Sequence, residues 1–374
     1  MENVERYKHL NKYLKEKFGE RTLKMGIDGN FTCPNRDGAK GFGGCIFCSE
    51  KGSGEHIKSN KTNKTKITSN NVECISNQVI DYFNSYKAKR ANKFIVYFQN
   101  FTNTYDTLEN LKLKYNSALI DSRIVGLEIA TRPDCINEDI AKLLKSYTDK
   151  YYVCVELGLQ TASEQTGLLI NRCYSNEDFT NAVSILNKNN IDVVTHIMIG
   201  LPCKDNNYLD DVKVTVDFLN KHNIQGLKIH SCYVVKNTRL EELYKTGKYT
   251  PISLDQYLEA CVYVLTHISP DVVIHRVSGD APKDLLVAPS WNLHKKWILN
   301  GLDRYLKEND LYQGMYNRKY WNIKLYLLLS IFILIWPSGY ERDLTTFCKF
   351  VKIRVFVGIS VFTRVFIYGT FVHF

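Results

Sequence analysis

The chain has 374 residues, of which 44% are apolar and 24% charged, so it can bury a large core and is not intrinsically disordered. Its formal net charge of +10 fits a polyanionic partner such as RNA, although no long basic run stands out. Eleven unevenly spaced cysteines in so long a chain exclude a small secreted disulfide scaffold. Residues 1–20 lack the apolar stretch of a secretory signal, and we therefore expect a cytoplasmic protein with reduced cysteines.

In chain order, residues 1–20 have the pattern of an amphipathic helix, and residues 21–60, rich in Gly, Asn and Cys, predict a long loop. Apolar runs with many β-branched and aromatic residues then alternate with amphipathic segments. The predicted strands span 94–99, 124–131, 151–160, 192–202, 226–235 and 271–279. The predicted helices span 71–89, 108–117, 140–145, 176–189, 210–222 and 254–268. This alternation predicts an α/β fold, a partial TIM-like barrel of six βα units with functional groups at the carboxyl ends of its strands.

The composition changes after Asn322. The apolar run LYLLLSIFILIW covers only residues 325–336, which is shorter than the roughly 20 residues that a bilayer span needs. We therefore divide the chain into a folded domain, residues 1–322, and a hydrophobic tail foreign to it, residues 323–374. The alternative is a membrane-associated hairpin that rests on the lipid interface.

Three cysteines lie close together in the predicted loop. In NFTCPNRDGAKGFGGCIFCSEKGSGE, Cys33, Cys45 and Cys48 have the spacing C-x11-C-x2-C. Thiolates are the usual ligands of iron–sulfur clusters, and three of them on a four-iron cube leave one iron open to another ligand. The spacing also allows a zinc site with His56 as a fourth ligand, or three buried cysteines that bind no metal.

The cysteine-containing run resembles the cluster loop of the YhcC/YtqA-type radical S-adenosylmethionine (SAM) proteins, which are related to the Elongator catalytic subunit and to oxygen-independent coproporphyrinogen oxidase. Six further segments resemble the same family in the same order, so that the resemblance covers about residues 5–320. These segments are YFQNFTNTY (97–105), GLEIATRPDC (126–135), VELGLQTASEQTGLLINR (155–172), HIMIGLP (196–202), LKIHSCYVVKNTRL (227–240) and RVSGDAP…LLVAPSW (276–291). The resemblance stops where the tail begins.

The resemblance implies a [4Fe–4S] cluster on the three cysteines, with SAM bound to the open iron through its amino and carboxylate groups. An electron, supplied by a donor such as flavodoxin or ferredoxin, would cleave SAM to methionine and a 5′-deoxyadenosyl radical, which abstracts a substrate hydrogen. The cofactors supply this chemistry, and the protein positions them and excludes water.

The resemblance also implies which residues contact SAM. Gln99 and Thr102, at the end of the first predicted strand, would hold the SAM amino group, and Glu156 and Gln160, at the end of the third, would contact the ribose or the amino group. Arg172 would face the SAM carboxylate. The backbone of Gly200 and Leu201, after the fourth strand, would line the adenine pocket. Each of the two charged residues could instead have a purely structural role. Glu156 could be a buried acid paired with an arginine, and Arg172 could lie on a helix surface.

Two positions depart from the family pattern. Cys203 and Cys173 stand where relatives usually carry glycine, and a cysteine in the tight bend at residue 203 predicts strain. His196 and His230 lie on predicted strands and are either core histidines or proton carriers.

The relationship to the Elongator subunit and the positive charge favour a radical SAM enzyme that modifies tRNA. The alternatives are a radical SAM enzyme that acts on a small metabolite or porphyrin-like compound, and a non-catalytic iron–sulfur or zinc protein.

Overall fold

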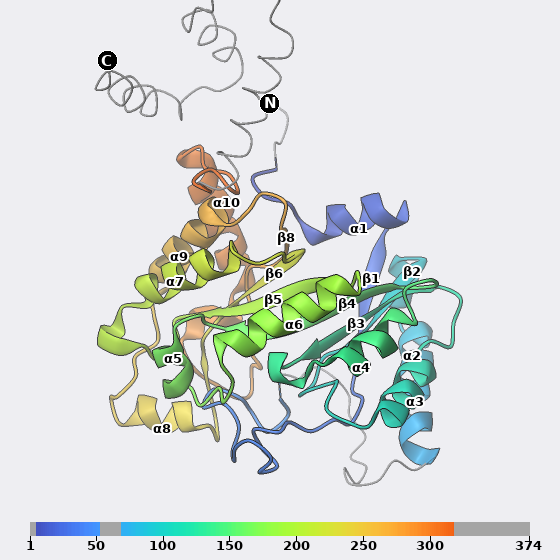
Figure 1. Ribbon diagram of the computed structural model, residues 1–374. Helices are drawn as coiled ribbons and strands as arrows, with labels where there is room; N and C mark the ends of the chain where they lie inside the picture. The colour runs from blue at the N-terminus through green and yellow to red at the C-terminus, as the bar shows by residue number, and fades with distance from the viewer. Residues whose placement is uncertain (1–4, 53–68, 318–374) are drawn as a thin grey trace, which may run out of the picture. The chain divides into compact units, whose positions relative to one another are not determined.

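The computed structural model describes residues 5–52 and 69–317, and these belong to one compact unit, Met1–Tyr320. Seven parallel strands form one sheet in the order β1-β2-β3-β4-β5-β6-β8 (Figure 1). The strands are β1 (Thr22–Ile27), β2 (Lys93–Phe98), β3 (Ile124–Thr131), β4 (Tyr152–Gln160), β5 (Asp192–Ile199), β6 (Gly226–Ser231) and β8 (Val273–Arg276). The strand order follows the chain order, as in a barrel built from successive βα units.

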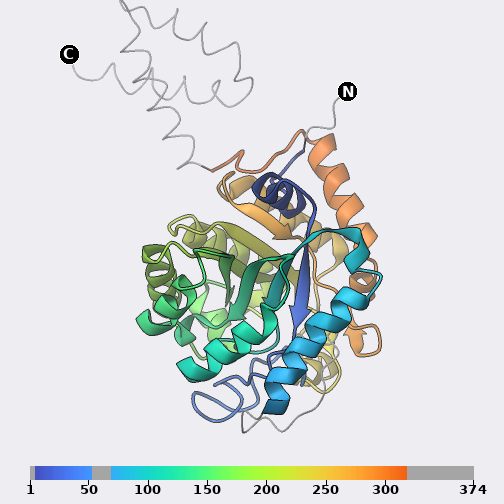
Figure 2. The ribbon, with the colours of Figure 1, turned by 90° about the vertical axis from the view of Figure 1, so that its right-hand side faces the viewer.

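Helices follow most of the strands and cover the outer face of the sheet (Figures 1 and 2). They are α1 (Leu10–Phe18), α2 (Ser69–Asn84), α3 (Leu108–Ala118), α4 (Glu138–Lys145), α5 (Glu164–Leu169), α6 (Asn176–Lys188), α7 (Tyr208–Leu219), α8 (Arg239–Lys245), α9 (Leu254–His267) and α10 (Lys295–Glu308). Short 3-10 turns span Ala88–Arg90, Pro133–Cys135, Lys204–Asn206 and Ser290–Leu293. In the described part of the chain, no helix combines the length and apolarity that a membrane span requires.

The sheet is curled, and its inner face carries polar side chains. The ammonium group of Lys24 on β1 lies 3.5 Å from Glu156 on β4 and 3.2 Å from Nδ1 of His275 on β8. Side chains from strands so far apart in the sheet order can meet only on the concave side of a curved sheet. The fold is therefore the predicted partial barrel, with an apolar layer between sheet and helices and a polar interior.

The segment Thr22–Ile27 corrects the prediction of an uninterrupted loop over residues 21–60. It forms strand β1 and pairs along its whole length with β2. Its sequence TLKMGI contains a lysine and a glycine, and a Gly- and Asn-rich segment follows it, so its local pattern is a weak strand signal. Its burial decides its conformation, because Met25 and Ile27 are fully buried in the main core.

A small second sheet lies beyond the strand ends, where β7 (Val234–Val235) pairs antiparallel with β9 (Leu286–Ala288). Both strands contribute to a separate apolar cluster that includes Ile46, Ile170 and Leu201. Because Ile46 belongs to the cysteine loop, this cluster anchors the loop. The backbone of the loop runs past the carboxyl ends of the parallel strands (Figure 2).

The predicted tail, residues 323–374, and His56 lie outside the described residues. The division of the chain at residue 322 and both accounts of the tail therefore stay predictions.

Candidate metal centre and cofactor site

The three cysteines of the loop lie near one another, because the charges of Cys33 and Cys48 both act on the Cys45 thiol. Cys33, Cys45 and Cys48 are all partly buried. Burial, followed by the charge of the neighbouring Cys48 thiol and that of Cys33, raises the pKa of Cys45 to about 12. The amide nitrogen of Asn35 lies 3.8 Å from the Cys45 sulfur, as a donor suited to a thiolate.

The backbone of the loop is folded tightly around these cysteines. The N–H groups of Arg36 and Asp37 donate to the carbonyl of Cys33, at 2.8 and 3.2 Å, and the Cys48 N–H donates to the carbonyl of Cys45 at 2.9 Å. Gly44 has a φ of +79°, and a Cβ there would lie only 2.9 Å from Nε of Arg36. A glycine is required at this position because both the backbone angle and the close approach exclude a side chain.

The connection after α5 holds the loop in place. The Asn35 side chain donates to the carbonyl of Asn171 at 2.6 Å, and the Asn171 side chain donates to the carbonyl of Gly44 at 2.8 Å. The backbone N–H of Ile46 donates to the carbonyl of Ile170 at 3.0 Å. These bonds tie the cysteine loop to the segment that carries Arg172.

The donor set fits a cluster better than a single ion. One tetrahedral Zn²⁺, with Zn–S bonds of about 2.3 Å, would draw its sulfur ligands to within about 4 Å of one another. Within residues 5–52 and 69–317, no three His, Cys, Asp or Glu side chains converge closely enough to hold one metal ion. A four-iron cube takes each thiolate on a different iron, and therefore does not require the three sulfurs to converge on one ion.

Gln99 and Thr102 follow the end of β2, beside the cysteine loop. Thr102 is fully buried, and its backbone N–H donates to the carbonyl of Thr32 at 3.1 Å, next to Cys33. Gln99 is partly buried directly after the strand. Both residues thus lie near the predicted cluster, and their contact with the SAM amino group stays a prediction.

Gln160 ends β4 in a strained conformation. Its φ is +67°, and the pairing with β5 shifts register between Gly158 and Gln160. A Cβ at residue 158 would lie 2.7 Å from Nε2 of Gln160, so the glutamine side chain needs the space that Gly158 leaves. Such bulges re-aim a side chain near active sites, which is compatible with a SAM contact here.

Glu156, on the same strand, is fully buried inside the sheet, among cations. One carboxylate oxygen lies 2.6 Å from Lys228 and 2.8 Å from Nε2 of His196, and the other lies 3.5 Å from Lys24. Burial alone would raise the pKa of Glu156, but the two ammonium groups lower it well below its usual value. The partners of Glu156 are therefore two lysines and a histidine. The purely structural role considered for Glu156 predicted an arginine as its partner.

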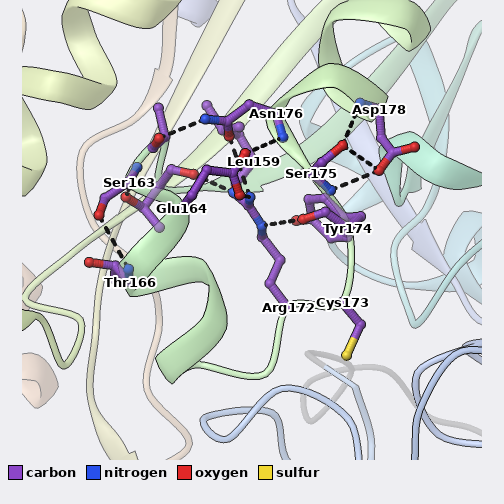
Figure 3. A network of polar contacts seen from close by, with 12 residues as sticks. Leu159, Ser163, Glu164, Thr166, Arg172, Cys173, Tyr174, Ser175, Asn176 and Asp178 are labelled. Atoms are coloured by element: carbon purple, nitrogen blue, oxygen red, sulfur yellow. Dashed lines mark hydrogen bonds and ion pairs between the residues drawn. The ribbon is translucent and has the colours of Figure 1, made fainter.

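The side chain of Arg172 is also enclosed, with only 1% of its surface exposed (Figure 3). Each of its five N–H groups has an acceptor in the protein, at 2.5–3.4 Å. The acceptors are the carbonyls of Leu159, Thr161 and Tyr174, the carboxylate of Glu164 and the amide oxygen of Asn176. Arg172 is thus not on a helix surface, and it joins the end of β4 to the segment that holds the cysteine loop.

Gly200 and Leu201 follow β5. Gly200 has a φ of +86°, a Cβ there would lie 2.9 Å from Ile252, and its carbonyl accepts a hydrogen bond from Tyr249 at 2.7 Å. The Leu201 side chain packs in the apolar cluster under the cysteine loop. The backbone of these two residues is held firmly beside the site, and their contact with adenine stays a prediction.

The two unusual cysteines behave differently from each other. Cys203 is in extended conformation, with φ of −131°, so the predicted strain at this position is absent. Cys173 is exposed and has a φ of +57°, a region that glycine adopts more easily. The strain lies at Cys173 because the chain must turn there between Arg172 and α6.

Of the charged and polar residues inside the sheet, the sequence pattern pointed to Glu156 and His196 but not to the other residues bonded to them. Seven side chains form one bonded group, which we call the interior network. They are Lys24, Tyr97, Glu128, Glu156, His196, Lys228 and His275, one on each of the seven strands. The signal was available, because TLKMGI, IVGLEIAT and GLKIHS each carry one charged residue within an otherwise apolar strand.

Comparisons with known proteins agree with this geometry. Residues 33–219 match the model of the radical SAM superfamily, and residues 224–308 match the radical SAM C-terminal domain. The uncharacterized protein YtqA of Bacillus subtilis is 37% identical over 312 residues, which cover 83% of this chain and 92% of YtqA.

More distant relatives cover less of the chain or share less identity. A tRNA uridine(34) acetyltransferase of Methanocaldococcus infernus is 29% identical over 170 residues, 44% of this chain and 30% of that protein. The structure of Elp3 from the same archaeon, with an N-terminal deletion, has a TM-score of 0.55 at 18% identity and covers 78% of this chain and 64% of that one. The chain therefore belongs to the radical SAM superfamily of enzymes, and its cofactors are a [4Fe–4S] cluster and S-adenosylmethionine.

Proposed function

We propose that this enzyme carries out radical SAM chemistry on a nucleoside of tRNA. The observation that carries the substrate class is the match over 170 residues to a protein named tRNA uridine(34) acetyltransferase. The formal net charge of +10 supports a polyanionic substrate. The target base would have to be turned out of its stack to reach the interior of the sheet.

Cys33, Cys45 and Cys48 would hold the cluster and leave one iron for SAM. When bound, these cofactors supply a radical that abstracts a hydrogen atom from the substrate. A small iron–sulfur or flavin protein, a ferredoxin or flavodoxin, would supply the electron.

The protein's own residues position the cofactors. Gln99, Thr102 and Gln160 are placed at the ends of β2 and β4, where they would orient SAM by hydrogen bonds. Arg172 fixes the segment to which the cysteine loop is bonded. The apolar cluster under the loop, with Ile46 and Leu201, would keep water from the reduced cluster.

The test is the nucleoside content of tRNA. A strain that lacks the gene should lose or accumulate one modified nucleoside, measured by mass spectrometry of digested tRNA, and the wild-type gene should restore it. Cys45→Ala should fail to restore it. Purified anaerobically and supplied with SAM and dithionite, the same variant should release at least 100-fold less 5′-deoxyadenosine, because the cluster loses a ligand.

Cys74→Ala is the matched control. Cys74 is partly buried on α2, outside the cysteine loop, and should be replaced without loss of activity. An unchanged nucleoside profile in the deletion strain would refute the tRNA assignment. Full 5′-deoxyadenosine release by Cys45→Ala would refute the cluster ligand.

A further inference from the structure

The interior network is costly to bury, which suggests a role beyond folding. The ammonium group of Lys228 lies 2.6 Å from Glu156 and 3.2 Å from the hydroxyl of Tyr97. Lys24 lies 2.5 Å from Glu128. Two ion pairs between strands are often no more stabilising than apolar side chains of the same volume. A barrel that needed only stability could fill this space with leucine and valine.

His196 is the member of the network whose protonation can be worked out. Its Nε2 is 2.8 Å from the Glu156 carboxylate. The pKa of Glu156 lies well below its usual value, so this carboxylate is ionised and can only accept. The imidazole must therefore carry a hydrogen on Nε2, and when the ring is neutral, the form that burial favours, its Nδ1 keeps a lone pair.

The His196 ring is also partly exposed. Its side chain is 18% exposed, whereas the carboxylate that holds it is fully buried. The strand register places His196 opposite Gly158 on β4, just before the strained turn at Gln160. The ring is thus one step deeper in the barrel than Gln160, which is expected to contact SAM.

His230 gives an independent indication of a ligand. Its ring centroid lies 5.1 Å from that of His196. Among the described residues, no group donates to or accepts from its buried Nε2. Buried polar atoms are rarely left without a partner, so an atom from outside the chain is expected to bond to this nitrogen. Two neighbouring histidine rings therefore each keep a ring nitrogen for which the described residues supply no hydrogen bond.

We propose that His196, held by Glu156, is the proton acceptor for a substrate group bound in the barrel interior, a nucleoside N–H or O–H next to the carbon that loses hydrogen. This inference rests on the proposed function and adds a catalytic residue to it. In the step, the substrate N–H or O–H bond breaks and its electron pair stays on the substrate. The proton bonds to Nδ1, and the imidazolium so formed is stabilised by the Glu156 carboxylate.

The charges around His196 fix the expected pH dependence. Burial lowers the pKa of His196, the Glu156 carboxylate raises it, and the cations lower it. The titratable and charged groups that face it, from β1 to β8, are Lys24, Tyr97, Glu128, Glu156, Lys228, His230, His275 and Arg276. Replacing Glu156 by Gln removes the one carboxylate bonded to the ring, so His196 should lose its proton at a lower pH than in the wild type.

The first experiment needs no substrate. The anaerobic holoenzyme is treated with diethyl pyrocarbonate across pH 5–8, and the carbethoxylation of His196 is measured by peptide mass spectrometry. We expect rapid modification above a midpoint pH, and a lower midpoint in Glu156→Gln. A His196 that is unreactive at every pH, or a midpoint that is equal in the two proteins, would overturn the proposal whatever the substrate is.

The second experiment measures how tightly substrate modification is coupled to the cleavage of SAM. The holoenzyme is incubated with SAM, reductant and total tRNA from the deletion strain, and modified nucleoside is divided by 5′-deoxyadenosine formed. We expect this ratio to fall at least tenfold in His196→Gln, because SAM is still cleaved but the substrate step is blocked. Damage to folding or to the cluster would lower both products and leave the ratio unchanged.

His222→Gln is the matched control, because His222 pairs with Thr180 away from the interior network. A wild-type ratio in His196→Gln would overturn the proposal while the tRNA assignment stands. If wild-type enzyme makes no modified nucleoside yet His196 titrates as expected, the tRNA assignment is overturned and the reactive imidazole stands.

Discussion

Single residues decide how the site is held together, and Arg172 is the clearest case. Sequence similarity assigns it to the SAM carboxylate, whereas its five N–H groups bond to protein acceptors. The two assignments differ in what a substitution would do. A SAM ligand affects SAM binding alone, and a structural clamp affects the stability of the folded protein.

We expect Arg172→Lys to lower the free energy of unfolding by about 3 kcal/mol, because an ammonium group supplies only three donors where the guanidinium supplies five, and buried acceptors lose their partners. Thermal unfolding of the anaerobic holoenzyme measures this. Lys142→Arg, at an exposed pair on α4, is the control and should leave the melting temperature unchanged. A stable Arg172→Lys enzyme with a raised Kd for SAM would instead support a direct contact.

At the scale of elements, the cysteine loop and the strands behave differently. The loop has few apolar side chains and is shaped by glycines and by side-chain amides, so its conformation depends on a few specific bonds. The strands are fixed by burial on both faces. Substitutions in the loop should therefore affect the cluster before they affect the fold.

Gly43 and Gly44 test this at neighbouring positions. Both have positive φ, but a Cβ at Gly43 meets nothing within 4 Å, whereas one at Gly44 lies 2.9 Å from Arg36. Gly43→Ala should cost about 1 kcal/mol, the penalty of a left-handed alanine. Gly44→Ala should also displace Arg36 and shorten the lifetime of the cluster in air severalfold, followed by absorbance near 400 nm. Equal lifetimes in the two variants would contradict the steric account.

Glu128 on β3 makes the free energy of unfolding depend on pH. Burial raises the pKa of Glu128 to about 7 from an ordinary value of 4.5. Between these values the folded protein binds the proton more tightly than the unfolded chain, so the free energy of unfolding falls as the pH rises through this window. The loss is on the order of 3 kcal/mol for one fully buried group.

Glu128→Gln stays neutral and should lack this loss, so that its stability relative to the wild type rises between pH 5.5 and 7.5 in unfolding experiments. Glu156→Gln is the comparison. The pKa of Glu156 is lowered, so the stability that its charge contributes is lost only as the pH falls below about 4.5, outside this window. Parallel pH curves for wild type and Glu128→Gln would show that Glu128 is ionised throughout.

At the scale of the whole molecule, the fold ends later than the family models do. The superfamily and C-terminal models together end at residue 308. The segment after α10 nevertheless bonds to α9, where Gly314 donates to the carbonyl of Leu265 and Tyr316 to that of Thr266, at 2.9 and 2.8 Å. Gln313 ties the same segment to the N-terminus through the carbonyl of Arg6.

Two truncations follow from this boundary. A chain that ends at residue 322 should release 5′-deoxyadenosine within twofold of the full chain, because every described contact is kept. A chain that ends at residue 308 should be destabilised by several kcal/mol, since buried backbone groups of α9 lose their partners. Activity assays and melting curves of both proteins measure this. A tenfold loss of activity on removal of residues 323–374 would show that the tail contributes to function.

The sequence alone determined the order of strands and helices and the three-cysteine loop, because both depend on residues close together in the chain. Apolar runs of strand length mark the strands, and thiols a fixed number of residues apart mark the loop. The sequence did not predict β1, whose weak local pattern is overruled by burial against β2. Nor could it show that Lys24, Glu156 and His275 meet, because Lys24 and His275 come from the two end strands of the sheet and Glu156 from the middle strand. Only the curling of the sheet brings such side chains together, and this long-range geometry decides which charged residues share one interior.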